Sequence, residues 1–156
     1  MSYAAPKVRD HMSRDVHMAA PEQTIREAAT AMARLGVGVL PVAEGDNLVG
    51  MVTDRDIAVR AVAEGLGPDT LVGEVMTREL KYCFDYEDLE MVARNMGDQQ
   101  VRRLPVLDQD KRVVGILSLG DVAAGVGALP AGDALAGVTR PRRPAHLASP
   151  ASYARV

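Results

Sequence analysis

Apolar side chains recur at every third or fourth position in two stretches of the chain, which is the spacing of one face of a helix. The positions are Ile25, Ala28, Ala29 and Met32 in the first stretch, and Leu89, Val92, Ala93 and Met96 in the second. Thr24 and Glu27 have the spacing of a capping box at the start of the first stretch. Gly36 and Gly97 follow the last apolar turns as stop signals. The pattern predicts two equivalent helices that end at these glycines.

Two short apolar runs separated by a polar turn follow each predicted helix. The first run of each pair contains Leu-Pro-Val, and the second ends at Thr53 or Ser118. Such runs predict strands, and the proline places the first of them at a sheet edge or a bulge. Second helices are expected at residues 56–64 and 119–126. With a short strand ahead of each first helix, the order of elements is β-α-β-β-α, given twice.

The two halves of this pattern are copies of one another, which is the signature of an internal repeat. The matching segments are VRDHMSRDV (8–16) with VGEVMTREL (72–80), and LVGMVTDRD (48–56) with VVGILSLGD (113–121). Pro105 lies 64 residues after Pro41, whereas Gly115 lies 65 residues after Gly50. One residue is therefore inserted in the second turn.

The pattern predicts a mixed α/β (α+β) fold with one repeat at residues 6–66 and another at 67–128. From residue 129 to 156 the composition shifts to Ala, Gly, Pro and Arg, with too few large apolar side chains to pack. We expect a mobile C-terminal tail there. A short helical turn at 133–138 against the domain is the alternative.

Composition narrows the functional class. With 47% hydrophobic and 25% charged residues the chain can bury a core, and its net charge of −3 gives no general reason to bind nucleic acid or an anionic membrane. Three arginines near the end, Arg140, Arg142 and Arg143, are too few to indicate nucleic-acid binding without a basic domain. No apolar run approaches the roughly 20 residues that cross a bilayer.

A single cysteine, Cys83, cannot form an internal disulfide, and the N-terminal segment lacks the apolar core of a signal peptide. We therefore expect a cytoplasmic protein in which Cys83 packs as a small hydrophobic residue. One cysteine and three histidines without typical spacing supply no zinc ligand set, so no metal site is expected.

The repeated motifs identify a family. They are VMT ahead of the first strand of a unit, LPV in the second, and a strand that runs through Gly into Thr or Ser with Asp three residues later. In this order, and given twice, they resemble the paired CBS domain (cystathionine-β-synthase domain) over about residues 6–127. The members that it resembles include stand-alone bacterial proteins, among them a hypoxic-response group.

This resemblance implies that the copies pack pseudo-symmetrically through their sheets and form two clefts, which in many relatives hold AMP, ADP, ATP or another adenosine derivative. It also implies a homodimer, because relatives commonly associate through the helices of the pair. The alanine-rich segment Ile57–Ala63 offers an apolar face for that contact. Since no enzyme or transporter domain is fused to the repeats, the output is expected to act on a separate protein.

Two hydroxyl–acid pairs stand where a strand enters a helix: Thr53 with Asp56, and Ser118 with Asp121. Taken alone, this spacing is that of a capping box, in which the two side chains satisfy free backbone N–H groups. The resemblance implies a different use. The aspartate accepts hydrogen bonds from the ribose hydroxyls, while the hydroxyl and the helix N-terminus favour a phosphate.

Arg102 and Arg103 precede the second Leu-Pro-Val, where nucleotide-binding relatives often place cations directed at phosphate. Guanidinium binds phosphate in a bidentate fashion and stays charged at neutral pH. The first copy has Gly38 and Val39 at these positions, so the two clefts are expected to be unequal. The alternative is a pair of solvated arginines on an edge strand.

The adenine ring is expected to lie against backbone and apolar groups in two segments, 13–18 and 77–82. The candidate residues are Ser13, Val16, Met18, Thr77, Leu80 and Tyr82. Backbone recognition leaves little trace in a sequence, so these residues rest on the family resemblance.

No nucleophile elbow, phosphate loop, metal-binding helix or Cys–His pair is recognisable, so no enzyme and no required cofactor are expected. The leading hypothesis is a regulatory module that senses an adenine nucleotide and signals to a partner. The alternative is a stress-induced structural or interaction dimer whose clefts are empty.

Overall fold

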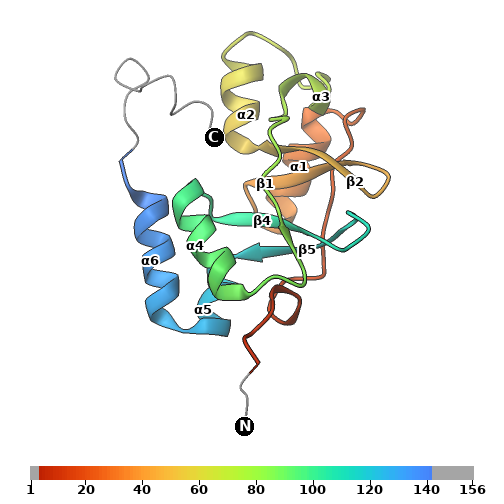
Figure 1. Cartoon of the computed structure of the whole chain (residues 1–156). Coiled ribbons are helices and arrows are strands. Elements are labelled where there is room, and N and C mark those ends of the chain that lie inside the picture. The colour runs from red at the N-terminus through yellow and green to blue at the C-terminus, as the bar shows by residue number, and fades with distance from the viewer. Residues whose placement is uncertain (1–3, 142–156) are drawn as a thin grey trace. The chain divides into compact units, whose positions relative to one another are not determined.

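The computed structural model describes residues 4–141, and its elements form two compact units. The N-terminal unit contains residues 15–81 and 109–113, and the C-terminal unit contains residues 4–14, 82–108 and 114–141. Figure 1 shows their helices and small sheets. The mixed α/β fold class is thus confirmed.

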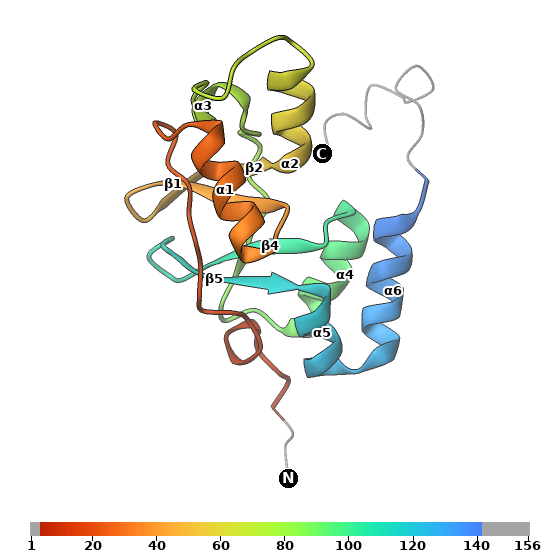
Figure 2. The same ribbon diagram turned by 180° about the vertical axis from the view of Figure 1, so that it is seen from behind.

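The N-terminal unit combines helices with a two-stranded sheet. Its elements are α1 (Ile25–Leu35), β1 (Val39–Glu44), β2 (Asn47–Thr53), α2 (Asp54–Asp56), the π-helical turn η2 (Ile57–Val62) and α3 (Val72–Val75). Strands β1 and β2 pair antiparallel, with a bulge at Val42 and Ala43. Helix α1 lies alongside β1 (Figure 2).

The C-terminal unit repeats this plan with a three-stranded sheet. Its elements are the 3-10 turn η1 (Val8–Asp10), β3 (Cys83–Phe84), α4 (Leu89–Gln99), β4 (Arg103–Leu107), β5 (Val113–Ser118), α5 (Leu119–Val126) and α6 (Ala128–Thr139). The strand order is β3-β4-β5, and β3 runs parallel to β4. The expected short strand ahead of the first helix is therefore present in this copy. In the first copy it is reduced to a single parallel bridge between Ala19 and Val42.

The ends of the two long helices follow different rules. Helix α1 begins at Thr24, whose hydroxyl accepts the N–H of Glu27 at 3.2 Å, and ends at Gly36 in the left-handed conformation (φ +66°). The predicted end of α4 at Gly97 is wrong, because the helix continues to Gln99 and Gln100 takes the left-handed turn instead. Gly97 has another role, which involves α6.

The segments that open each copy, residues 8–13 and 72–77, are here called leader segments, and each packs in the unit built mainly from the other copy. Val72, Val75 and Met76 belong to the core of the N-terminal unit. Val8 and Met12 belong to the core of the C-terminal unit. The compact units therefore exchange the leader segments relative to the linear repeat, because these apolar side chains are buried against partners far away in the sequence.

The glycine that each second strand contains leaves room for the backbone of a leader segment. Thr77 forms a two-way backbone bridge with Met51 (2.7 and 2.9 Å), and a Cβ at Gly50 would stand 2.6 Å from the Thr77 carbonyl oxygen. In the C-terminal unit Ser13 forms the same bridge with Ile116 (2.9 Å in both directions). The repeated glycine of each second strand thus gives the incoming backbone room to approach.

Residues 129–139, which the composition assigns to a mobile tail, instead belong to helix α6, and the alternative turn at 133–138 lies within this helix. Helix α6 lies alongside α4 in both views (Figure 1, Figure 2). A Cβ at Gly97 would meet Ala134 Cα at 3.2 Å, and Gln100 Nε2 donates to the carbonyl oxygens of Gly137 (3.1 Å) and Arg140 (2.8 Å). Helix α6 therefore packs on α4 through close contacts between small residues, although this segment has few large apolar side chains.

The remainder of the predicted tail, residues 142–156 with Arg142 and Arg143, lies outside the described residues. Among residues 4–141, no helix has both the length and the apolar character needed to cross a membrane.

The helix contact between α6 and α4 predicts opposite effects for two Gly→Ala changes in α6. A Cβ at Gly137 would stand 2.6 Å from the Gly97 carbonyl oxygen, so Gly137→Ala should lower the free energy of unfolding by about 1–3 kcal/mol. Gly132 has no atom within 4 Å of its Cβ position, so Gly132→Ala should raise it by about 0.5–1 kcal/mol through helix propensity. Urea denaturation of both variants measures the difference. Equal effects at the two positions would contradict the close packing of α6 on α4.

Candidate functional site

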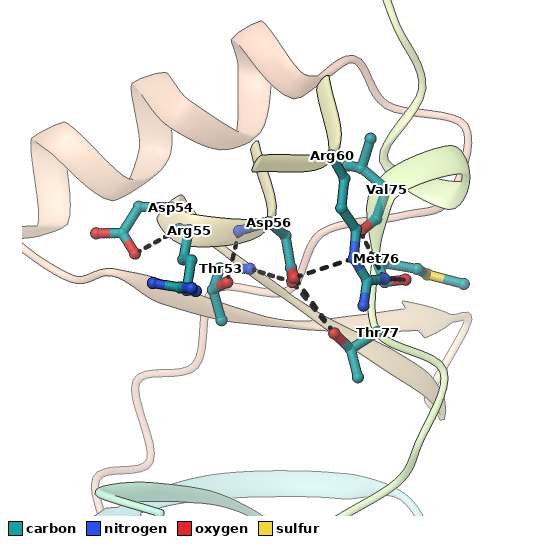
Figure 3. A network of polar contacts seen from close by, with 8 residues as sticks. All are labelled: Thr53, Asp54, Arg55, Asp56, Arg60, Val75, Met76 and Thr77. Carbon is teal, nitrogen blue, oxygen red and sulfur yellow. Dashed lines mark hydrogen bonds and ion pairs between the residues drawn. The ribbon is translucent and has the colours of Figure 1, made fainter. Parts of the chain in front are cut away.

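Thr53 and Asp56 form a closed capping box at the junction of β2 and α2 (Figure 3). The Thr53 N–H donates to Asp56 Oδ2 at 3.0 Å, and the Asp56 N–H donates to Thr53 Oγ1 at 2.9 Å. The local alternative for this motif is therefore realised in the geometry. A capping box alone does not decide whether the side chains also meet a ligand.

The carboxylate of Asp56 has two further partners. The Thr77 hydroxyl lies 3.4 Å from Oδ1 and 3.3 Å from Oδ2, and Arg60 Nε lies 3.7 Å from Oδ1. Arg60 Nη1 also donates to the carbonyl oxygens of Val75 (3.3 Å) and Met76 (3.1 Å). The structure thus brings together three predicted site residues, Thr53, Asp56 and Thr77, from both copies of the repeat.

Arg60 is a member of this network that the sequence analysis missed. It lies four residues after Asp56, and an acid and a base at that spacing share one helix face. This charge pattern was the available signal. It is a weak one, because many exposed pairs have the same spacing without a functional partner.

Ser118 and Asp121 form the equivalent capping box at the junction of β5 and α5. The Ser118 N–H donates to Asp121 Oδ2 at 2.8 Å, and the Asp121 N–H donates to Ser118 Oγ at 3.2 Å. Asp121 is half-buried, and within the described part of the chain its carboxylate bonds to no other side chain. The two predicted pairs therefore share a scaffold and differ in their surroundings.

Arg102 is joined to the second pair by the backbone. Its carbonyl oxygen accepts the N–H of Leu119, the residue after Ser118, at 3.2 Å, and Arg103 opens β4. Both arginines are exposed. The structure therefore brings Arg102 close to Ser118, with Arg103 as its neighbour in the chain.

The same backbone bond in the N-terminal unit joins two residues of different chemistry. The Asp54 N–H donates to the Gly38 carbonyl oxygen at 2.9 Å. A Cβ at Gly38 would stand 2.9 Å from Asp54 Oδ2, so the absent side chain leaves room for the carboxylate. Where the C-terminal unit has Arg102 and Leu119, the N-terminal unit has Gly38 and Asp54.

The candidate adenine contacts are placed less clearly. The backbone groups of Ser13 and Thr77 are already used in their bridges to Ile116 and Met51. The other candidates are Val16 and Met18, which are half-buried, and Leu80 and Tyr82, which are 43% and 42% exposed. Within residues 4–141, no hydrogen bond or ion pair links these four to Asp56 or Asp121. Their role in adenine binding stays a prediction.

Cys83 is buried, as expected for a small hydrophobic residue. Burial, together with the nearby carboxylates of Glu87 and Asp85, raises the pKa of its thiol to about 12. The thiol is therefore protonated at neutral pH and a poor nucleophile. Across the described residues, no group of three or more His, Cys, Asp or Glu side chains is placed to hold a metal ion.

Comparison with known proteins matches the CBS domain model at residues 8–62 and again at 72–127. The CBS domain-containing protein YhcV of Bacillus subtilis is 46% identical over 116 residues, which are 74% of this chain and 82% of the relative. Hypoxic response protein 1 of Mycobacterium tuberculosis is 35% identical over 117 residues, 74% of this chain and 81% of that protein.

This chain is also similar in fold to solved structures of such proteins. A crystal structure of Hypoxic Response Protein I with two coordinated zinc ions has a TM-score of 0.70 and 33% identity, and the match covers 78% of this chain and 99% of that one. CBSX2 in complex with AMP has a TM-score of 0.67 and 30% identity, with 76% and 93% covered.

Proposed function

This chain belongs to the CBS-domain family, and on that premise we propose that it is a regulatory module that binds an adenosine nucleotide and signals to a separate protein. The observation that carries the proposal is the group at the start of α5. There a serine hydroxyl, an aspartate with one carboxylate oxygen that bonds to none of the described residues, and two arginines belong to neighbouring strand and helix ends. CBSX2, a structural relative, is described in complex with AMP, which supports an adenosine ligand.

Each part of this group suits one part of a nucleotide. The Asp121 carboxylate has acceptor capacity left over for ribose hydroxyls. The Ser118 hydroxyl and the positive end of the α5 dipole favour a phosphate, and the guanidinium groups add charge-assisted hydrogen bonds to it.

Calorimetry with AMP, ADP, ATP, S-adenosylmethionine and adenosine tests the proposal. At least one adenosine compound should release or absorb heat, and at about one hundred times its Kd should stabilise the fold by about 2.7 kcal/mol. Thermal unfolding with and without each compound provides a second readout. Absence of heat and of any thermal shift with all five would favour the alternative, a structural dimer with empty clefts.

Removing Arg103 should separate phosphate binding from adenosine binding. Charge-assisted hydrogen bonds contribute about 1.5–3 kcal/mol, so Arg103→Ala should weaken AMP by roughly ten- to hundredfold. Adenosine lacks the phosphate, and its affinity should change by less than about 0.5 kcal/mol, as for an ordinary surface change.

Arg34→Ala, which removes an exposed arginine of α1, is the matched control and should leave both ligands unchanged. Calorimetry of AMP and adenosine on both variants measures the effect. Equal small losses for AMP and adenosine in Arg103→Ala would remove this arginine from the site.

A homodimer is supported by an apolar face of the N-terminal unit. Val59, Val62 and Leu66 are 48%, 68% and 45% exposed, and two neighbouring hollows of about 500 and 460 Å³ lie between α1 and η2. Both hollows are lined by Ala29 and Ala33. A second copy of the chain would remove this apolar surface from water.

Light scattering after size exclusion should report twice the chain mass of 16.6 kDa. Ala33→Glu places a charge between the hollows and should shift the protein to monomer, because a charge buried without a partner is costly. Arg34→Glu, on the same helix but outside both hollows, should stay dimeric. A wild-type monomer at every concentration would exclude the dimer.

A further inference from the structure

We infer that the two hydroxyl–acid pairs have different roles. Ser118 and Asp121 bind the nucleotide, whereas Thr53 and Asp56 are structural: together with Arg60 and Thr77, which contact the Asp56 carboxylate, they form a polar network that is here called the structural joint. The inference rests on the proposed function and deepens it, because it limits each chain to one nucleotide. Three observations carry it: the partners of Asp56, the residue that replaces Arg60 in the second copy, and the charges beside each pair.

The carboxylate of Asp56 is already occupied. It accepts the Thr53 N–H, contacts the Thr77 hydroxyl with both oxygens and lies 3.7 Å from Arg60 Nε, while only 12% of its side chain is exposed. A carboxylate offers about four acceptor sites. The Thr53 N–H and the Thr77 hydroxyl use two of these sites, and the side chain is nearly buried, so a ribose diol would have to compete with Thr77 and Arg60 for the carboxylate.

These contacts hold a leader segment in place. Arg60 donates to the carbonyl oxygens of Val75 and Met76 (Figure 3). Thr77 is bridged by its backbone to Met51. Asp56 is the anion that fixes both Arg60 and the Thr77 hydroxyl. Its role in the N-terminal unit is to join η2 to residues 75–77, which belong to the second copy of the repeat.

The second copy cannot build this joint. The position that corresponds to Arg60, 65 residues later, is Gly125. A Cβ there would collide with Leu89 Cδ2 and stand 2.9 Å from His11 Cγ, so no larger residue fits without rearrangement. Ser13 takes the position of Thr77, and its side chain is exposed. In the described part of the chain, Asp121 therefore keeps one carboxylate oxygen without a protein partner.

Charge favours the same pair by an independent route. Arg102 and Arg103 flank the Ser118 junction, whereas Gly38 and Asp54 flank the Thr53 junction. A phosphate is attracted by the first arrangement and repelled by the carboxylate of the second. In the N-terminal unit the cation Arg60 is paired with Asp56, and Arg55 stands between Asp54 and Asp56 in the chain, whereas in the C-terminal unit Arg102 and Arg103 accompany the hydroxyl–acid pair.

The test is calorimetry with AMP and thermal unfolding of three proteins: wild type, Asp121→Asn and Asp56→Asn. The wild type should bind one AMP per chain. Asp121→Asn keeps the shape of the side chain and an acceptor for the Ser118 N–H, so its Tm should stay within about 2 °C, while its AMP affinity should fall roughly ten- to hundredfold. Asp56→Asn should lower Tm by roughly 3–10 °C and leave AMP affinity within about threefold.

Thr77→Val serves if Asp56→Asn does not fold, because it removes only one hydroxyl from the joint and should lower Tm without weakening AMP. Two AMP molecules per wild-type chain would overturn the inference. The inference would also be overturned if Asp56→Asn lost as much AMP affinity as Asp121→Asn. The same holds for Thr77→Val if that variant is used in place of Asp56→Asn. Neither of these outcomes would contradict the proposed function, because the wild type would still bind the nucleotide. The absence of any AMP heat in the wild type would instead reject the inference for this ligand and, if the other adenosine compounds also fail, the proposed function.

Discussion

The structure depends on two backbone bridges that attach each leader segment to a strand of the other copy. Thr77 pairs with Met51, and Ser13 pairs with Ile116, in both cases through two hydrogen bonds. A backbone can approach this closely only where the neighbouring strand residue has no side chain, as at Gly50. The bridges also bring Thr77 beside Asp56, so the same contact that completes the core assembles the polar network.

On this shared scaffold, a few replacements change the chemistry. Arg102 stands where the first copy has Gly38, and Gly125 stands where it has Arg60. The first exchange adds a cation to the residue whose backbone bonds to the start of α5, and the second removes the cation that in the first copy is paired with the aspartate. Repetition thus preserves the hydrogen bonds that shape the junction, while single side chains decide which junction has capacity left for a ligand.

Helix α6 distinguishes the helix faces of the two units. In the C-terminal unit it packs on α4 through Gly97 and Gly137, and the Ala93 side chain is almost fully buried. The equivalent Ala29 and Ala33 of α1 are exposed. The matched CBS domain ends at residue 127, one residue before α6, so this cover is an addition to the repeat.

The sequence by itself determined the repeat, the first long helix of each copy, the paired strands and the capping boxes at Thr53 and Ser118, because periodicity, turn residues and capping spacing act between residues close in the chain; helix α6, which the composition assigned to a mobile tail, was not among them. The hydroxyl–acid pairs Thr53–Asp56 and Ser118–Asp121 were found in this way. Only the tertiary structure decided that Thr77 and Arg60 occupy Asp56, that Gly97 receives a helix, and that the leader segments exchange. Each of these depends on contacts between residues distant in sequence or on the space around one side chain, and neither leaves a periodic trace.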